Sequence, residues 1–290
     1  MSTLKVILGP TAVGKTDYSI SLALKLRCPI VSCDSRQLFR GMAIGTAQPT
    51  AEQLSAVRHY FIACKNPDEH YTAGLYEIEA LQLLKELFKE YGTIVMTGGS
   101  GLYVDALCNG LDDFPPANLE LREQLTERVR TEGVASLRND LRILDPESYA
   151  KIDIANPQRV VRALEVTLST GRKFSDFKTS PAKKRDFEIE KYCLVRPREE
   201  LYGRIDSRVD AMFEAGLVEE VRSLLPFRGM PALNTVGYKE IFQYLDGDID
   251  IKEVLRLIKR NTRHYAKRQM TYWARDPQIE YITLQPRSSR

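Results

Sequence analysis

The fold of this chain is decided by its opening stretch, Leu4-Lys5-Val6-Ile7-Leu8-Gly9-Pro10-Thr11-Ala12-Val13-Gly14-Lys15-Thr16. An apolar strand runs directly into a complete G-x-x-x-x-G-K-[ST] loop, and helical spacing continues to Leu26. In this context the loop backbone turns its N–H groups inward toward phosphate oxygens, at the positive end of a helix. Lys15 adds a positive charge, and the Thr16 hydroxyl is suited to Mg²⁺. We therefore expect residues 9–16 to bind a di- or triphosphate with Mg²⁺ at Thr16.

The bulk composition describes an ordinary globular protein. The 290 residues are 43% hydrophobic and 28% charged, with no apolar run near the ~18 residues of a membrane span. The first strand begins too early to leave room for a signal peptide. Five cysteines without C-x-x-C pairs, and three dispersed histidines, argue against zinc sites and disulfide frameworks. We expect a cytoplasmic, monomeric protein with no membrane association.

Strands and helices alternate along the first part of the chain. Apolar segments at 4–8, 29–33, 60–63 and 93–96 read as strands, and a helix with Leu75, Ile78, Leu81, Leu84 and Phe88 on its apolar face is expected over 72–91. Further strands are expected at 192–195 and 279–284, with helices over 198–275 between them. The pattern predicts an α/β fold whose core is a P-loop NTPase-like, doubly wound parallel sheet.

A purely helical segment interrupts this alternation after Asp112-Asp-Phe-Pro-Pro116. We expect residues 115–186 to form a small all-helical insertion domain. The catalytic core would then be discontinuous, built from residues 1–114 and 187–290.

Two further sites follow predicted strands. Asp34 ends the second strand, so a parallel sheet places it on the same edge as the phosphate loop, where it could act as a base or bind Mg²⁺ through water. The alternative is an aspartate that caps a turn with Ser35. Gly98-Gly-Ser-Gly101 ends the fourth strand and offers backbone amides and the Ser100 hydroxyl to a ligand.

The segment 251–275 is strongly basic, with eight Lys or Arg residues and one acid, Glu253. At helical spacing six of them form one stripe, separate from a mostly apolar face that can meet the core: Lys252, Arg256, Lys259, Arg260, Arg263 and Lys267. The stripe is either a solvated surface or a contact for a polyanion, and the scarcity of acids favours the polyanion.

Tyr272 and Trp273 either close the core or stack on a base. From these residues alone, attack on phosphorus and attack on carbon with loss of diphosphate remain equally open.

The chain resembles the tRNA dimethylallyltransferases, also called tRNA isopentenylpyrophosphate transferases. Beside the phosphate loop, the resemblance is carried by Asp34-Ser-Arg-Gln-Leu-Phe-Arg-Gly-Met-Ala-Ile-Gly-Thr-Ala-Gln-Pro49, Gly98-Gly-Ser-Gly-Leu-Tyr103, Asn156-Pro-Gln-Arg-Val-Val-Arg-Ala-Leu-Glu165, Arg198-Glu-Glu-Leu-Tyr-Gly-Arg-Ile-Asp206, Val236-Gly-Tyr-Lys-Glu240 and Lys267-Arg-Gln-Met-Thr271. These motifs occur in order along essentially the whole chain.

The resemblance implies transfer of a dimethylallyl group from dimethylallyl diphosphate to the exocyclic amine of the adenosine next to the anticodon on its 3′ side. The acceptors would be tRNAs that read codons beginning with U. It assigns diphosphate to Gly9, Pro10, Thr11, Ala12, Val13, Gly14, Lys15 and Thr16, and catalytic roles to Asp34 and Ser100. It assigns tRNA contacts to Asp34, Ser35, Arg36, Gln37, Ser100, Arg122, Gln158, Arg159, Val160, Val161, Arg162, Asn234, Thr235, Val236, Gly237, Tyr238, Lys239, Lys267, Arg268, Gln269, Met270, Thr271, Tyr272, Trp273 and Ala274.

Three other functions stay open. A related adenylate isopentenyltransferase would prenylate free AMP, ADP or ATP, but needs neither the helical insertion nor the basic helix. A small-molecule P-loop kinase would use the same loop for ATP. A non-enzymatic RNA-binding module would leave Asp34 without a purpose.

Overall fold

The computed structural model describes residues 2–178 and 182–285; residues 179–181 of the predicted insertion and the last five residues of the predicted core lie outside them. The chain divides into two compact units, residues 1–109 with 185–290, and residues 110–184. None of the described helices combines the length and apolar character needed to cross a membrane.

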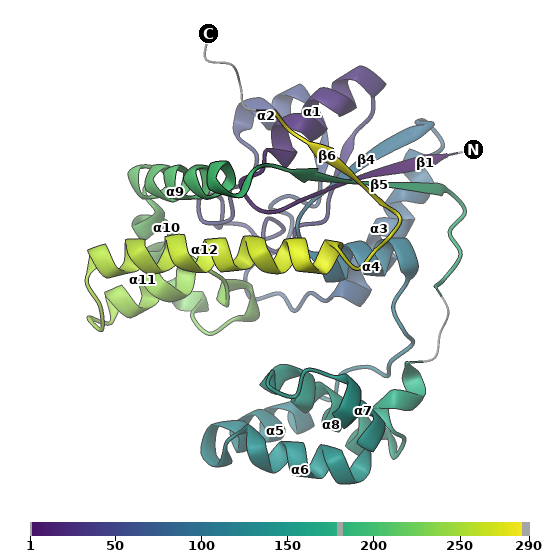
Figure 1. The fold of residues 1–290 in the computed structure, drawn as a ribbon, viewed down its shortest axis with the longest axis vertical. Coiled ribbons are helices and arrows are strands. Elements are labelled where there is room, and N and C mark those ends of the chain that lie inside the picture. The colour runs from purple at the N-terminus through teal and green to yellow at the C-terminus, as the bar shows by residue number, and fades with distance from the viewer. Residues whose placement is uncertain (1, 179–181, 286–290) are drawn as a thin grey trace. The chain divides into compact units, whose positions relative to one another are not determined.

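The larger unit is built on a six-stranded, all-parallel sheet (Figure 1). Its strands are β1 (Thr3–Leu8), β2 (Ile30–Ser32), β3 (His59–Tyr60), β4 (Thr93–Thr97), β5 (Glu188–Val195) and β6 (Ile279–Thr283), in the spatial order β3-β2-β4-β1-β5-β6. The parallel sheet expected from the sequence is confirmed. Because β2, β4 and β1 are neighbours, the segments that follow them meet at one edge, where ligands bind in such folds.

Helices bury both faces of this sheet (Figure 1). Ile7, Ile30 and Val95 pack with α1 (Lys15–Leu26) in one apolar cluster. On the opposite face Tyr76 of α3 (Ala73–Leu87) donates to Ser32 O at 3.0 Å and touches the Met96 sulfur. Both faces are therefore covered, which explains the continuous apolar runs of the strands.

Two details of the predicted elements were wrong. Strand β3 ends at Tyr60, because Phe61 and Ala63 have φ of 61° and 46°, a left-handed backbone incompatible with a strand. Helix α3 ends at Leu87 and not at residue 91, and Leu75 and Ile78 are exposed. The helix face turned to the sheet carries Tyr76, Ala80 and Leu84. The predicted apolar face was wrong at Leu75 and Ile78 because the tyrosine was not counted as an apolar residue.

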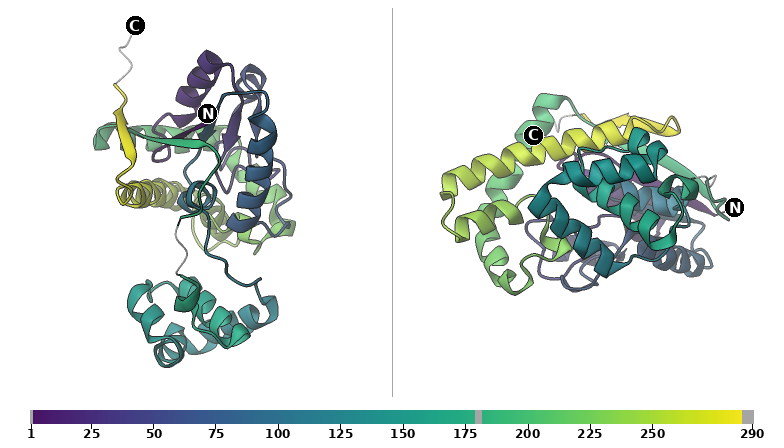
Figure 2. Two further views of the ribbon diagram at one scale, coloured as in Figure 1. Left: turned by 90° about the vertical axis from the view of Figure 1, so that its right-hand side faces the viewer. Right: turned by 90° about the horizontal axis from the view of Figure 1, so that it is seen from below.

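The remaining helices of the larger unit are α2 (Ala51–Ala56), α4 (Gly101–Asn109), α9 (Arg198–Glu214), α10 (Leu217–Ser223), α11 (Tyr238–Leu245) and α12 (Ile251–Trp273), with short 3₁₀ turns η2 (Leu225–Phe227) and η3 (Pro231–Leu233). Helices α9 to α12 form an extension with its own apolar cluster, joined to the segment 38–42 after β2. Figure 2 shows α12 as the longest of these helices. This extension builds one wall of the site described below.

The smaller unit is helical: α5 (Leu119–Glu132), α6 (Val134–Leu144), α7 (Pro146–Lys151), α8 (Pro157–Thr170) and the 3₁₀ turn η1 (Phe174–Phe177). Leu137, Leu141 and Leu164 are completely buried in its core. Three helices begin with side-chain caps, from Asn118, Asp145 and Asn156.

Candidate active site

The phosphate loop joins β1 to α1 and folds around its own lysine. Lys15 Nζ donates to Gly9 O and to Pro10 O, each at 2.9 Å. Gly9 has φ of +140°, and a Cβ there would lie 2.7 Å from Leu194 O of β5, so a larger residue would push the loop away from the sheet. The loop is therefore held in a closed turn with its lysine inside.

Positive charge is concentrated at this loop. Burial, followed by the neighbouring Arg208, lowers the pKa of Lys15 to about 8, against the opposite pull of the Asp34 carboxylate. Burial and the nearby Arg204 also lower the pKa of Arg208. Two partly desolvated cations side by side favour a bound anion, because an anion would offset both the burial and the repulsion.

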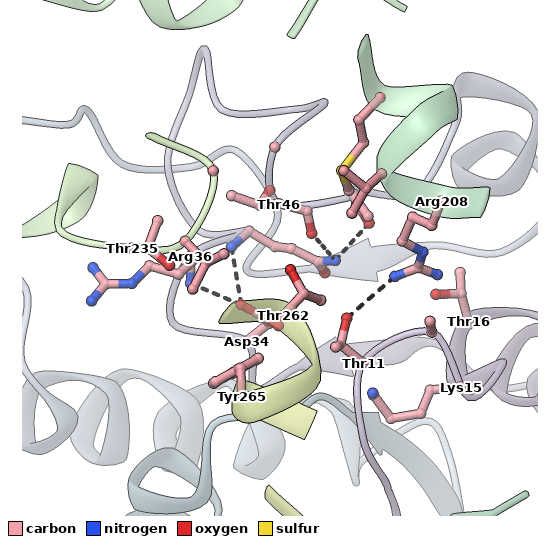
Figure 3. Close-up of a pocket in the computed structure, with 18 of the residues that line it drawn as sticks. Thr11, Lys15, Thr16, Asp34, Arg36, Thr46, Arg208, Thr235, Thr262 and Tyr265 are labelled. Atoms are coloured by element: carbon pink, nitrogen blue, oxygen red, sulfur yellow. Dashed lines mark hydrogen bonds between the residues drawn. The ribbon is translucent and has the colours of Figure 1, made fainter. Parts of the chain in front are cut away.

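The sequence reasoning gave no role at the loop to three arginines that surround it. Arg204 Nε donates to Ala12 O and Arg196 Nε to Val13 O, both at 2.8 Å, while Arg208 Nη1 lies 3.5 Å from Thr11 Oγ1 (Figure 3). The four-residue spacing of Arg204 and Arg208 does place both on one face of α9. Nothing in that spacing shows that this face meets the phosphate loop.

Asp34 lies just after β2, where its carboxylate caps a turn. Its Oδ1 accepts hydrogen bonds from Arg36 N at 2.9 Å and Gln37 N at 3.3 Å, so it caps a turn two and three residues ahead and not at Ser35. Among the described residues Oδ2 has no hydrogen-bond partner in the structure, and Asp34 lines the cavity shown in Figure 3. Burial and then the Asp34 carboxylate raise the pKa of Tyr265, whose ring lines the same cavity.

Ser100 is hydrogen-bonded to Ser35, in the segment after β2. Its Oγ accepts from Ser35 N at 2.9 Å and donates to Ser35 Oγ at 3.0 Å. Of the residues at the end of β4, Thr97 and Gly98 line the cavity. In this structure the Ser100 hydroxyl holds the residue next to Asp34.

One cavity of about 140 Å³ connects these groups. Its polar lining comes from the phosphate loop and its surroundings: Thr11, Lys15, Thr16, Asp34, Arg36, Thr46 and Arg208 (Figure 3). Its apolar lining comes from α9, α10, α12 and the turn before α11: Val209, Met212, Leu217, Val236 and Ile258. All five apolar residues belong to one packed cluster, so they form a continuous wall.

A second, more open groove adjoins this cavity. The two share Arg36, Thr235, Val236 and Tyr265. The groove is completed by Ser35, Asn234, Lys239, Glu240, Asn261, His264 and Arg268. The structure thus brings together, at one place, predicted tRNA-contact residues from the segment after β2, the turn before α11, and α12.

Several residues predicted to touch tRNA are instead buried. Tyr238 and Trp273 are at most 2% exposed and line neither the cavity nor the groove, whereas Gln269, 5% exposed, lines the cavity from α12. Trp273 packs edge-on against Tyr272, with ring centroids 5.1 Å apart, and the Tyr272 hydroxyl bonds to Asp105. Of the two readings of this ring pair, core closure is therefore confirmed for Trp273.

The rest of the last turns of α12 lies differently. Lys267, Arg268, Thr271 and Ala274 are exposed, and Met270 is half-buried. Thr271 Oγ1 donates to Lys267 O within the helix at 3.0 Å. The side chains of Lys267, Arg268 and Thr271 are therefore accessible to a ligand.

In the helical unit the predicted contacts also divide. Val160 and Val161 are buried in its core, because they face inward from α8, whereas Gln158 and Arg159 are exposed at the start of that helix. Arg122 Nε and Arg162 Nη1 bind opposite oxygens of the fully buried Glu165, at 2.7 and 2.6 Å.

The basic stripe of α12 is less free than its sequence indicates. Arg263 forms a two-point ion pair with Asp206, and Lys259 binds Asp210 at 2.6 Å, both on α9. Acids on a neighbouring helix, distant in sequence, therefore neutralise part of the stripe. Within the stripe Arg256 is exposed but paired with Glu253 of its own helix at 2.6 Å, and Lys252, Arg260 and Lys267 remain exposed, as does the neighbouring Arg268.

The described residues contain no group of three or more His, Cys, Asp or Glu side chains arranged to hold a metal ion. A phosphate loop needs none, because Mg²⁺ there binds a loop hydroxyl, phosphate oxygens and water. The Thr16 hydroxyl and Asp34 both line the cavity and fit such a site.

Taken together, the all-parallel sheet, the phosphate loop and the half-apolar cavity define a P-loop α/β enzyme that acts on a phosphorylated substrate. The chain belongs to the IPP transferase family, whose model matches residues 37–276. It is 52% identical to tRNA dimethylallyltransferase 2 of Porphyromonas gingivalis over 97% of this chain and 93% of that protein. It is 47% identical to tRNA dimethylallyltransferase 1 of Bacteroides thetaiotaomicron, with 97% and 92% covered.

Solved structures agree with this assignment. The fold is similar to that of the tRNA isopentenylpyrophosphate transferase of Bacillus halodurans, with a TM-score of 0.71 and 35% identity over 98% of this chain and 90% of that one.

Proposed function

We propose that this protein transfers a dimethylallyl group from dimethylallyl diphosphate to the exocyclic amine of the adenosine 3′ to the anticodon, in tRNAs that read codons beginning with U. The observation that carries the donor assignment is the cavity itself, with cations at the phosphate loop and a continuous apolar wall. A short branched hydrocarbon is matched to such a wall, whereas the sugar and base of ATP would leave polar groups there unpaired.

The phosphate loop serves as the leaving-group site. As the allylic carbon–oxygen bond breaks, negative charge accumulates on the diphosphate. The loop amides, Lys15 and Arg208 are already in place to stabilise that charge, so little reorganisation is needed during the reaction. Thr16, with Asp34 through water, would hold Mg²⁺, which supplies Lewis-acid stabilisation of the leaving diphosphate when bound.

Asp34 is the candidate base. Its Oδ1 is committed to the turn at Arg36 and Gln37, which fixes the carboxylate and leaves Oδ2 for a substrate proton. In the transfer, the adenine amine forms the new bond to the allylic carbon, the carbon–oxygen bond to diphosphate breaks, and the amine proton passes to Asp34. Ser100 supports this step through Ser35.

The groove beside the cavity is the candidate acceptor site. A base must leave its stack before its exocyclic amine can be reached, and Arg36, Thr235, Val236 and Tyr265 lie where groove and cavity join. Exposed Lys239, Arg268 and Lys267 suit the phosphates of an anticodon loop, and in the helical unit Gln158 and Arg159 offer a further contact. We propose a monomer that works in the cytoplasm, in keeping with five free cysteines.

The test is transfer of label from dimethylallyl diphosphate, with Mg²⁺, to unmodified tRNA, AMP and ATP offered separately. We expect transfer to tRNA alone. Transfer to AMP or ATP would indicate an adenylate isopentenyltransferase, and release of phosphate from ATP would indicate a kinase.

A further inference from the structure

We propose that Glu220 of α10 is a positioning residue that sets the shape of the donor cavity, by joining the loop 44–47 to Tyr238 at the start of α11. The proposal rests on the proposed function, since it concerns the cavity assigned to the dimethylallyl group. Glu220 belongs to no motif that identified the site.

One carboxylate makes all three connections. Glu220 Oε2 accepts from Ile44 N at 2.7 Å, and Oε1 accepts from Gly45 N at 2.9 Å and from the Tyr238 hydroxyl at 2.7 Å. Backbone and phenol donors to a charged acceptor form strong, directional hydrogen bonds. Burial, followed by the Glu220 charge, raises the pKa of Tyr238, so the phenol keeps the proton that it donates.

The groups that Glu220 joins are two walls of the cavity. Gly45, Thr46 and Ala47 line it from one side, and Thr235–Gly237, directly before Tyr238, line it from another. Leu217, one helical turn before Glu220, belongs to the apolar wall. Glu220 therefore fixes the distance between a wall formed by the segment after β2 and a wall formed by the helical extension.

Contact between these walls is close. A Cβ at Gly45 would lie 2.6 Å from the Tyr238 ring, so the loop backbone lies directly on the fully buried tyrosine. The loop is also tied internally, because Gln37 Nε2 donates to Thr46 O and Ala47 O at 3.1 and 2.7 Å. The loop is thus tied together as one unit, and its hydrogen bonds to Glu220 fix the position of that unit.

The consequence is a selective effect on the donor. Lys15 and Arg208, the side chains assigned to the diphosphate, form no hydrogen bond or ion pair with Glu220 in the described structure. Loosening the loop should therefore weaken recognition of the hydrocarbon and leave recognition of diphosphate intact.

The experiment compares Glu220→Gln and Tyr238→Phe with the wild type. In Glu220→Gln the amide N–H₂ must face one of three donors, so we expect the KM for dimethylallyl diphosphate to rise about tenfold, with kcat reduced about threefold or less. Tyr238→Phe loses only one of the three bonds and should raise KM about threefold. Inorganic diphosphate, measured as a competitive inhibitor, should keep its inhibition constant within about twofold.

Glu219→Gln is the matched control, since it makes the same charge change on an exposed neighbour. The double variant Glu220→Gln/Tyr238→Phe should raise KM no more than Glu220→Gln alone, because both changes act on one linkage. Gly45→Ala, which disturbs the same contact from the loop side, should reproduce the rise in KM.

The outcomes separate this inference from the function on which it rests. A wild type that fails to prenylate tRNA contradicts both. An active wild type with an unchanged KM in Glu220→Gln and Gly45→Ala contradicts the inference alone. Equal loss of donor and inorganic diphosphate binding, with a lowered melting temperature, would mean a general loss of structure and would also overturn it.

Discussion

Gln269 of α12 is hydrogen-bonded to Thr11 of the phosphate loop: its Oε1 accepts from Thr11 N at 2.8 Å. Its Nε2 donates to Gly99 O, at the end of β4, at 3.0 Å. A single buried amide therefore joins the phosphate loop to the helix that carries His264, Tyr265 and Arg268 of the open groove. Gln269 was predicted to touch tRNA, and the structure gives it this internal role.

Gln269→Leu tests that role. The leucine leaves the Thr11 N–H and the Gly99 carbonyl without partners, so we expect a loss of about 1–3 kcal/mol in the free energy of unfolding. Because Thr11 lines the cavity, the KM for dimethylallyl diphosphate should also rise. Urea unfolding and steady-state kinetics measure the two effects, and Gln278→Leu, on an exposed glutamine, is the control. Unchanged stability and KM would contradict the linkage.

Asp34→Asn separates the two roles of Asp34. Asparagine keeps the oxygen that accepts from Arg36 N and Gln37 N, so the turn should survive, but it cannot take a proton. We expect the single-turnover rate of transfer to fall by about 10²–10⁴, with tRNA affinity changed little. Asp34→Ala should lose the turn as well and add a loss of stability. A near-normal rate in Asp34→Asn would remove Asp34 from the chemistry.

Lys15 predicts a pH dependence of donor binding. Its pKa is about 8 in the folded protein and 10.5 in the unfolded chain, so the loop loses this charge as pH rises through 8. The affinity for dimethylallyl diphosphate should fall between about pH 7 and 9.5 in the wild type. In Lys15→Arg, whose guanidinium stays charged, the fall should be shallower. Parallel titration curves for the two proteins would contradict this assignment.

The lowered pKa of Lys15 also makes protein stability depend on pH, in the opposite direction to donor binding. Between about pH 8 and 10.5 the unfolded chain binds the Lys15 proton and the folded protein does not. The contribution of Lys15 to the free energy of unfolding should therefore rise with pH over this window in the ligand-free protein. In Lys15→Met that rise should disappear, as measured by urea unfolding at several pH values. A matching pH profile in Lys15→Met would show that other groups govern stability there.

Among the described residues, the basic side chains of α12 fall into two groups, those paired with an acid and those exposed without such a pair. Lys267→Ala/Arg268→Ala should flatten the dependence of log affinity for tRNA on log salt by about one to two, since each lost phosphate contact removes close to one. Arg263→Ala should change this slope much less, because Arg263 is paired with Asp206. Equal slopes for the two variants would mean that the ion pairs open when tRNA binds.

Glu165 should stabilise the helical unit. Its buried carboxylate accepts from Arg122, Arg162 and, at 3.0 Å, Asn118 N at the start of α5. Glu165→Ala should lower the free energy of unfolding of this unit by about 2–3 kcal/mol, because three bonds to one charged acceptor are lost. Limited proteolysis within residues 110–184 of the full chain should accelerate accordingly. Glu147→Ala, which breaks only an exposed pair with Lys151, should have little effect.

The parts of the fold that the sequence predicts are those with local signals. Apolar strands, glycines at strand ends and capping residues lie close together in the chain, so the parallel sheet and the position of Asp34 after β2 follow from short segments. The pairing of α9 with the phosphate loop has no such signal. Arg204 meets Ala12 across 192 residues of sequence, and Arg263 meets Asp206 across 57. Partners of this kind depend on how helices pack, which helical spacing does not determine.

The sequence did not predict that some residues in the motifs assigned to tRNA contact are buried, for a related reason. Tyr238 and Gln269 lie in motifs associated with tRNA, yet Tyr238 is buried against the loop 44–47 and Gln269 joins the phosphate loop to Gly99. A sequence motif indicates that a residue is needed, but it does not show whether the side chain contacts the ligand or packs inside the protein.

The self-bonded loop after β2 has a consequence for binding kinetics. Gln48 Nε2 donates to Gln37 O and Phe39 O, and Gln37 in turn bonds Thr46 and Ala47, so the loop keeps its shape without any ligand. A donor molecule then meets a wall that is already ordered and loses little affinity to the freezing of flexible chain. Its association rate should be governed by diffusion and charge, with no slow folding step of the loop ahead of capture.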